Sequence, residues 1–93
     1  MSGESVITYR AVPAHDELHL DGESLVLVDG QVQRVSPLGT LIRERAVEPA
    51  TVEELAAALV EEFGAPPDGD AVEVTRASVE ALVDAGLLER DSL

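Results

Sequence analysis

The amino-acid sequence predicts an α+β fold in which a three-stranded antiparallel sheet comes first and a three-helix bundle follows. Up to about Ser36, apolar residues alternate with polar ones or form short β-branched runs, and Asp-Gly pairs separate them, which is typical of hairpins. After Pro37, apolar residues recur at the spacing of one helix face, and capping residues precede these segments. Residues 1–93 are expected to form one domain, with strands over about 5–36 and helices over about 37–88.

The first strand-like segments lie before the first Asp-Gly pair. Residues 6–10 are rich in β-branched side chains and stop before Pro13. Residues 17–20 alternate polar and apolar side chains and are a candidate for an extra short strand. No strand is expected after Pro49, where the sequence has helical periodicity.

The strongest strand signal is a pair of apolar segments, residues 24–28 and 31–35, joined by Asp29 and Gly30. An Asp-Gly pair between two such segments predicts a hairpin with a two-residue turn. Because residues 25–28 are all apolar, this strand presents apolar side chains on both of its faces. One face must pack on helices, and the other needs a cover from the N-terminal segment or from a partner.

Two helices follow the predicted hairpin. Ser36 and Pro37 suit the N-cap and the first position of a helix that runs to about Arg45. Thr51 has capping-box spacing, because an acidic residue follows three positions later, and it begins a second helix that ends at Gly64.

The third predicted helix starts near Asp70, ends at Gly86 and carries two apolar stripes. The first stripe is formed by Val72, Thr75, Val79, Leu82 and Val83. The second has smaller side chains and is formed by Val74, Ala77, Ala81 and Ala85. A surface helix needs one apolar stripe, so the second either reflects helix-favouring alanines alone or lines a groove that another backbone can approach.

The core is predicted from the inward faces of these elements. It comprises Leu25, Leu27, Val35, Ile42, Leu55, Leu59, Phe63, Val79, Leu82 and Leu87. A three-stranded sheet followed by three helices built around such a core is a winged-helix-like arrangement.

The composition limits the classes of partner. Nineteen acidic residues and six arginines give a formal net charge of −13, and this negative field repels nucleic acid and anionic membrane surfaces. There is no cysteine for a disulfide or a thiolate metal site. We expect a cytoplasmic protein, because no signal peptide or membrane-spanning segment is visible.

No residue pattern indicates catalysis. His15 and His19 are four positions apart in a loop and strand segment, where they would lie roughly 13 Å apart and could not share a metal ion. None of the six serines lies in a nucleophile elbow, and the glycines are dispersed as turn and cap residues. We therefore expect no enzyme, no catalytic residue, no cofactor and no metal.

Several segments together resemble PqqD-like proteins. These are residues 25–30, the helix start at residues 35–42, the capping segment 51–55 with the following Phe63-Gly64, and residues 79–88. Their order and spacing carry the resemblance, which covers most of the chain from Leu25 onward.

The resemblance implies a non-catalytic peptide-recognition domain, also called a RiPP recognition element. Such a domain captures the leader of a ribosomally synthesised precursor peptide by strand addition and presents it to a modifying enzyme, such as a radical SAM maturase. The implied peptide-binding residues lie on the last strand and on the third helix: Val32, Gln33, Arg34, Val35, Val74, Ala77, Ser78 and Ala81. In this family a large apolar residue is common where this chain has Ser78.

Two other functions fit the sequence. The domain could be a structural module that self-associates through its sheet edge, and we expect either a monomer or a weak homodimer in solution. It could also be a winged-helix DNA-binding protein, but Arg76 is the single arginine of the third helix, against three acidic residues.

Overall fold

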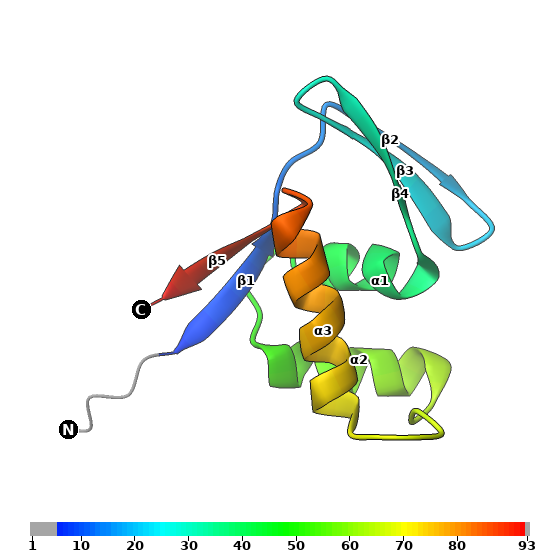
Figure 1. The fold of residues 1–93 in the computed structure, drawn as a ribbon, viewed down its shortest axis with the longest axis vertical. Coiled ribbons are helices and arrows are strands. Elements are labelled where there is room, and N and C mark those ends of the chain that lie inside the picture. The colour runs from blue at the N-terminus through cyan, green and yellow to red at the C-terminus, as the bar shows by residue number, and fades with distance from the viewer. Residues whose placement is uncertain (1–5, 93) are drawn as a thin grey trace.

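The computed structural model describes residues 6–92. In this part of the chain, five strands and three helices follow one another (Figure 1). They are β1 (Ile7–Ala11), β2 (Asp16–Leu20), β3 (Glu23–Val28), β4 (Gln31–Val35), α1 (Pro37–Arg45), α2 (Val52–Phe63), α3 (Ala71–Asp84) and β5 (Leu88–Ser92).

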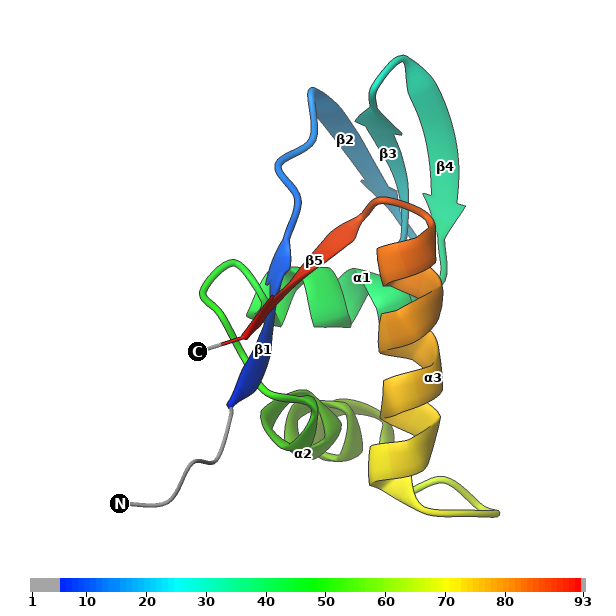
Figure 2. The same cartoon turned by 60° about the vertical axis from the view of Figure 1, so that its left-hand side comes forward.

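The predicted three-stranded antiparallel sheet and the three helices are confirmed, but the sheet has different members from those expected. Its order is β2-β3-β4, so the candidate short strand at residues 17–20 belongs to the sheet. The segment predicted at residues 6–10 forms β1, which pairs instead with β5 in a separate two-stranded ribbon. Figure 2 shows this ribbon apart from the three-stranded sheet.

The expectation of no strand after Pro49 was wrong. Leu87 and Leu88 are each only 2% exposed, so the chain stays against the core after α3 and runs antiparallel to β1. An ion pair between Arg10 and Glu89, with 2.9 Å between Nη2 and Oε1, joins the two strands. The polar residues after Leu88 lack the alternation that marks a strand in the sequence, which is why β5 was missed.

Two Asp-Gly turns build the three-stranded sheet. Asp21 and Gly22 join β2 to β3 with φ angles of 56° and 82°, and Asp29 and Gly30 join β3 to β4 with 53° and 77°. Positive φ at both turn residues is the requirement of the type I′ hairpin, which Asp-Gly satisfies at little cost. The hairpins fix the register of all three strands.

The inner face of the sheet carries the side chains of alternate β3 residues, Ser24, Val26 and Val28. Val26 and Val28 pack with the helices into one core, and the hydroxyl of Ser24 hydrogen-bonds that of Thr40 in α1. The predicted core residues Val35, Ile42, Leu55, Leu59, Val79, Leu82 and Leu87 are all buried.

Three predicted core residues lie elsewhere. Leu25 is 41% exposed and Leu27 is half-buried, because both point to the outer face of the sheet. Every position of residues 25–28 is apolar, so the sequence could not decide which alternate set faces inward. Phe63 is 50% exposed because it is the last residue of α2 and reaches beyond the helix packing.

The helix boundaries follow the capping residues expected from the sequence. Ser36, Thr51 and Asp70 are the N-caps of α1, α2 and α3, and Thr51 forms a complete capping box with Glu54. After α3, the N–H of Leu87 donates to the carbonyl of Leu82, the hydrogen bond of a Schellman end.

Gly39 in α1 allows β4, α1 and α3 to pack closely. A Cβ atom at this position would lie 2.7 Å from Cγ1 of Val35 and 3.5 Å from Cδ2 of Leu82. The absence of a side chain therefore sets the distance between the end of β4 and the helices, and it keeps α3 beside the strand.

Candidate functional site

β4 is an edge strand of the three-stranded sheet. It pairs with β3 on one side, and within residues 6–92 no strand pairs with its other side. An unpaired edge presents free N–H and C=O groups to which another strand can add. The residues that carry these free groups can be assigned from the hydrogen bonds and the register.

The backbone of the central strand β3 points alternately to its two neighbours. The N–H of His15, in the segment before β2, donates to the carbonyl of Leu27 with 2.8 Å between N and O. The backbone of Leu27 therefore faces the β2 side. By alternation, the backbones of Ser24, Val26 and Val28 face β4.

The register carries this alternation over to β4. Gln31, Gln33 and Val35 are the partners of the three β3 residues that face β4, so their backbone groups point into the sheet. Val32 and Arg34 lie between these positions. Their N–H and C=O groups therefore point to the free edge, where they offer two donors and two acceptors.

The side chains of β4 divide between the two faces of the sheet. Gln33 lies on the inner face, and its Nε2 donates to the carbonyl of Ala85, at the end of α3, over 2.8 Å. Arg34 lies on the outer face, where its Nε contacts Oε1 of Glu23 at 2.9 Å. Val32, also on the outer face, is 65% exposed. The side chain of Gln33 thus connects β4 to α3. The side chains of Val32 and Arg34 point to the outer face of the sheet and do not cover the free edge of β4.

Three members of the second apolar stripe, Val74, Ala81 and Ala85, lie together with Ser78 on the flank of α3 nearest β4. Val74, Ser78, Ala81 and Ala85 follow one another at helical spacing, on the side opposite Val83. Val83 lines a shallow hollow with Tyr9 and Arg90 beside β5, so the stripe faces away from the ribbon. The Gln33–Ala85 hydrogen bond fixes the C-terminal end of this flank against β4.

The predicted site residues on α3 differ in exposure. Val74 is 38% exposed, Ala77 and Ala81 are exposed, and Ser78 is half-buried. Ala77 lies further round the helix than the other three, toward solvent. The exposed side chains at Ala77 and Ala81 are small, and Val74 is the largest side chain on this flank.

Comparison with known proteins decides the family. Residues 18–88 match the family model described as coenzyme PQQ synthesis protein D (PqqD), which covers most of the chain. The chain belongs to the PqqD family. Among curated proteins and among solved structures, nothing matches it.

The PqqD match has a clear structural boundary. It begins within β2 and ends at the first residue of β5. The three-stranded sheet and the three helices are thus nearly complete within it, whereas β1 and most of β5 lie outside. The edge of β4 and the flank of α3 both belong to the family-matched part.

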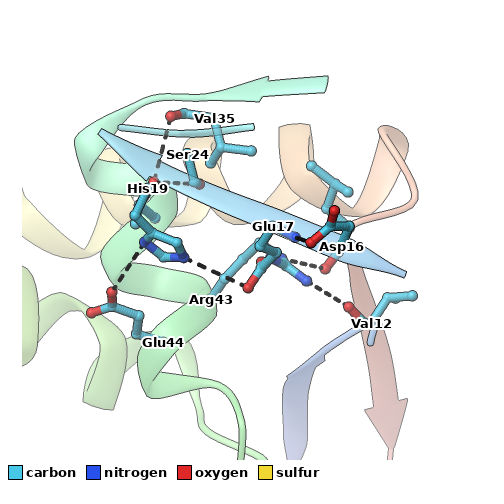
Figure 3. A network of polar contacts seen from close by, with 10 residues as sticks. Val12, Asp16, Glu17, His19, Ser24, Val35, Arg43 and Glu44 are labelled. Carbon is cyan, nitrogen blue, oxygen red and sulfur yellow. Dashed lines mark hydrogen bonds and ion pairs between the residues drawn. The ribbon is translucent and has the colours of Figure 1, made fainter. Parts of the chain in front are cut away.

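A buried arginine that the sequence analysis did not single out holds this part to the ribbon. The side chain of Arg43 in α1 is 8% exposed and contacts the carboxylate of Glu17 in β2 (Figure 3). It also donates to the carbonyl oxygens of Val12 and Leu87. Arg43 therefore connects α1, β2, the segment after β1 and the residue that precedes β5. The sequence carries no local signal for this role, because the partners of Arg43 lie in other segments.

The two histidines singled out by the sequence lie away from β4. His19 is exposed, with its Nε2 3.7 Å from Oε2 of Glu17 and its Nδ1 4.0 Å from Oε2 of Glu44 (Figure 3). His15 precedes β2 and is also exposed. Within residues 6–92, no three histidine or acidic side chains are grouped closely enough to hold a metal ion.

An open hollow lies beside this polar network, not beside β4. It has a volume of about 560 Å³ and is open to solvent. Its lining includes Arg10, His19 and Arg43 from β1, β2 and α1.

Among residues 6–92, no helix is long and apolar enough to cross a membrane.

Proposed function

We propose that this PqqD-family chain is a non-catalytic binding module for the leader segment of a ribosomally synthesised precursor peptide. The leader adds as a strand to the free edge of β4, and the module presents it to a modifying enzyme, such as a radical SAM maturase. The observation that carries the proposal is the open edge at Val32 and Arg34 beside the small-residue flank of α3, in a chain of this family.

Main-chain hydrogen bonds supply much of the binding in this mode. An antiparallel leader uses the backbone groups of Val32 and Arg34 and extends the sheet to four strands. Its side chains then alternate between the two faces of the sheet. Those on the inner side contact Val74, Ser78 and Ala81, and those on the outer side lie next to Val32.

The charge of the module selects a basic or neutral partner. The formal net charge is −13, so positive residues in the leader or in the modifying enzyme favour association. The negative field also works against a second copy of the chain and against nucleic acid.

Fluorescence anisotropy with a labelled peptide tests the proposal. The probes are synthetic peptides from the short reading frames that neighbour the gene of this chain. Ala81→Trp should weaken binding at least tenfold, because the ring fills the space beside β4, while Ala57→Trp on the exposed face of α2 should leave binding unchanged. Circular dichroism verifies that both variants are folded. Equal binding by both would place the site elsewhere.

Self-association is a second candidate, and the outer face of the sheet favours it. Leu18, Leu20, Leu25 and Val32 are 41–69% exposed on this face. Contiguous apolar surface of this kind is typical of interaction sites. Sedimentation velocity over a concentration series separates the two functions, because a dedicated peptide module remains monomeric without peptide.

A further inference from the structure

A small apolar hollow lies at the N-terminal end of α3, beyond the proposed strand site. It has a volume of about 250 Å³. It is formed by the start of α1, the end of α2, the connection that follows and the start of α3. Three of its apolar side chains are unusually exposed, since Phe63, Val74 and Val60 are 50%, 38% and 37% exposed.

The hollow continues the path of the edge strand. β4 ends at Val35 and passes through Ser36 into α1, whose second residue, Leu38, lines the hollow. Val74 belongs both to the flank of α3 and to the hollow. Figure 1 shows the end of β4, the start of α1 and the end of α2 following one another down one side of the molecule.

The direction of an added strand determines which part of a peptide reaches the hollow. A strand antiparallel to β4 has its N-terminal end beside Val35. Residues that precede the paired segment therefore leave the sheet near Leu38 and pass along the start of α3. The residues that follow the paired segment leave at the other end, near the Asp29-Gly30 turn.

The charges around the hollow indicate the chemistry of its occupant. No lining residue is charged, so the interior suits an apolar side chain. Exposed carboxylates flank the lining segments in sequence: Glu62, Asp68, Asp70 and Glu73. Arg76, the basic residue of α3, lies on the other flank, where it lines a different hollow with Ile7 and Tyr9.

We infer that this hollow is a second peptide subsite, which binds an apolar side chain flanked by lysine or arginine on the N-terminal side of the paired segment. The inference rests on the proposed function. It adds a second contact for the peptide and specifies the direction in which the peptide lies. The edge of β4 then holds the backbone, and the hollow holds one side chain several residues upstream.

The test uses the peptide that wild-type protein binds in the anisotropy assay, together with versions shortened from either end. Phe63→Ser and Val60→Ser should each weaken binding of the full peptide by about tenfold, because each removes apolar surface from the hollow. Val47→Ser, at a 71% exposed apolar position between α1 and α2, is the matched control and should bind normally. Circular dichroism establishes that the three variants are folded.

Peptide truncation distinguishes a binding contact from an indirect structural effect. Removing the residues before the paired segment should cost wild-type protein about tenfold in affinity and cost Phe63→Ser almost nothing, since the contact is already lost. Independent losses in protein and peptide would overturn the inference, and so would a loss on truncation of the C-terminal side alone. Failure of every peptide to bind wild-type protein would overturn the proposed function itself.

Discussion

Proline substitutions at two adjacent positions of β4 should have opposite consequences. The N–H of Arg34 points to the free edge, whereas the N–H of Gln33 points to β3. Proline removes the donor, and its ring occupies the space in front of it. Arg34→Pro should therefore weaken strand addition in a folded protein, and Gln33→Pro should destabilise the fold.

The magnitudes follow from the contacts at each position. Gln33→Pro leaves the carbonyl of Val26 without its donor, at about 1–3 kcal/mol, and removes the side-chain bond to Ala85, at about 1 kcal/mol. Its unfolding free energy should fall by about 2–4 kcal/mol. Arg34→Pro removes only an ion pair whose side chains are 77% and 41% exposed, which contributes little to stability. Its peptide affinity should fall at least tenfold, about 1.4 kcal/mol.

Urea denaturation and peptide anisotropy measure the two effects separately. Gln33→Ala and Arg34→Ala are the matched controls, because they remove the side chains and keep the backbone donors. Arg34→Ala should bind peptide nearly as well as wild type. If Arg34→Pro unfolded the protein and Gln33→Pro remained stable, the assignment of the free edge would be reversed and the reasoning refuted.

Three further perturbations test the packing and the electrostatics. Leu59→Ala or Leu82→Ala should lower the unfolding free energy by about 2–5 kcal/mol in urea titrations, and an unchanged midpoint would contradict their burial. Gly39→Ala should cost about 1–3 kcal/mol in the same assay, because its new Cβ would lie 2.7 Å from Cγ1 of Val35; an undiminished midpoint would mean that β4 can move away freely. Association rates measured by stopped-flow fluorescence should fall as salt rises, since the chain carries a formal charge of −13, and salt-independent rates would show that this charge does not steer the peptide.

The sequence predicted the elements that have local signals. The Asp-Gly turns and the N-caps Ser36, Thr51 and Asp70 depend on residues close together in the chain, and the structure confirms them. These signals were sufficient for the hairpins, the three helices and their boundaries.

The features that the sequence missed depend on distant residues. The inward set of β3 was undetermined, because both alternate sets are apolar, and only packing on the helices selects Val26 over Leu25. β5 forms because burial of Leu87 and Leu88 places the residues that follow beside β1. The residues of β5 do not themselves favour a strand. The role of Arg43 could not be predicted, because its partners Glu17, Leu87 and Val12 belong to three other segments of the chain.

The candidate site was partly predictable. The resemblance to PqqD-like proteins implied a site on β4 and α3, and the second apolar stripe of α3 was visible in the sequence. The sequence could not say which of Gln33 and Arg34 faces outward, because that depends on the pairing of β3 with both neighbours. The hollow at Phe63 needs the end of α2 to lie beside Leu38, which no local pattern encodes.

The β1–β5 ribbon gives the domain an order of assembly. Its strands join residues 79 positions apart at the Arg10–Glu89 pair, whereas each hairpin of the sheet closes over two residues. Loop closure over so long a span is slow and entropically costly, so the hairpins and helices should condense first and the ribbon last. During synthesis, β1 leaves the ribosome early and can bond to Ala46 and Ala50 on one side, but its partner strand on the other side, residues 88–92, emerges last. We expect Tyr9, 4% exposed in the finished fold, to be covered only in that final step.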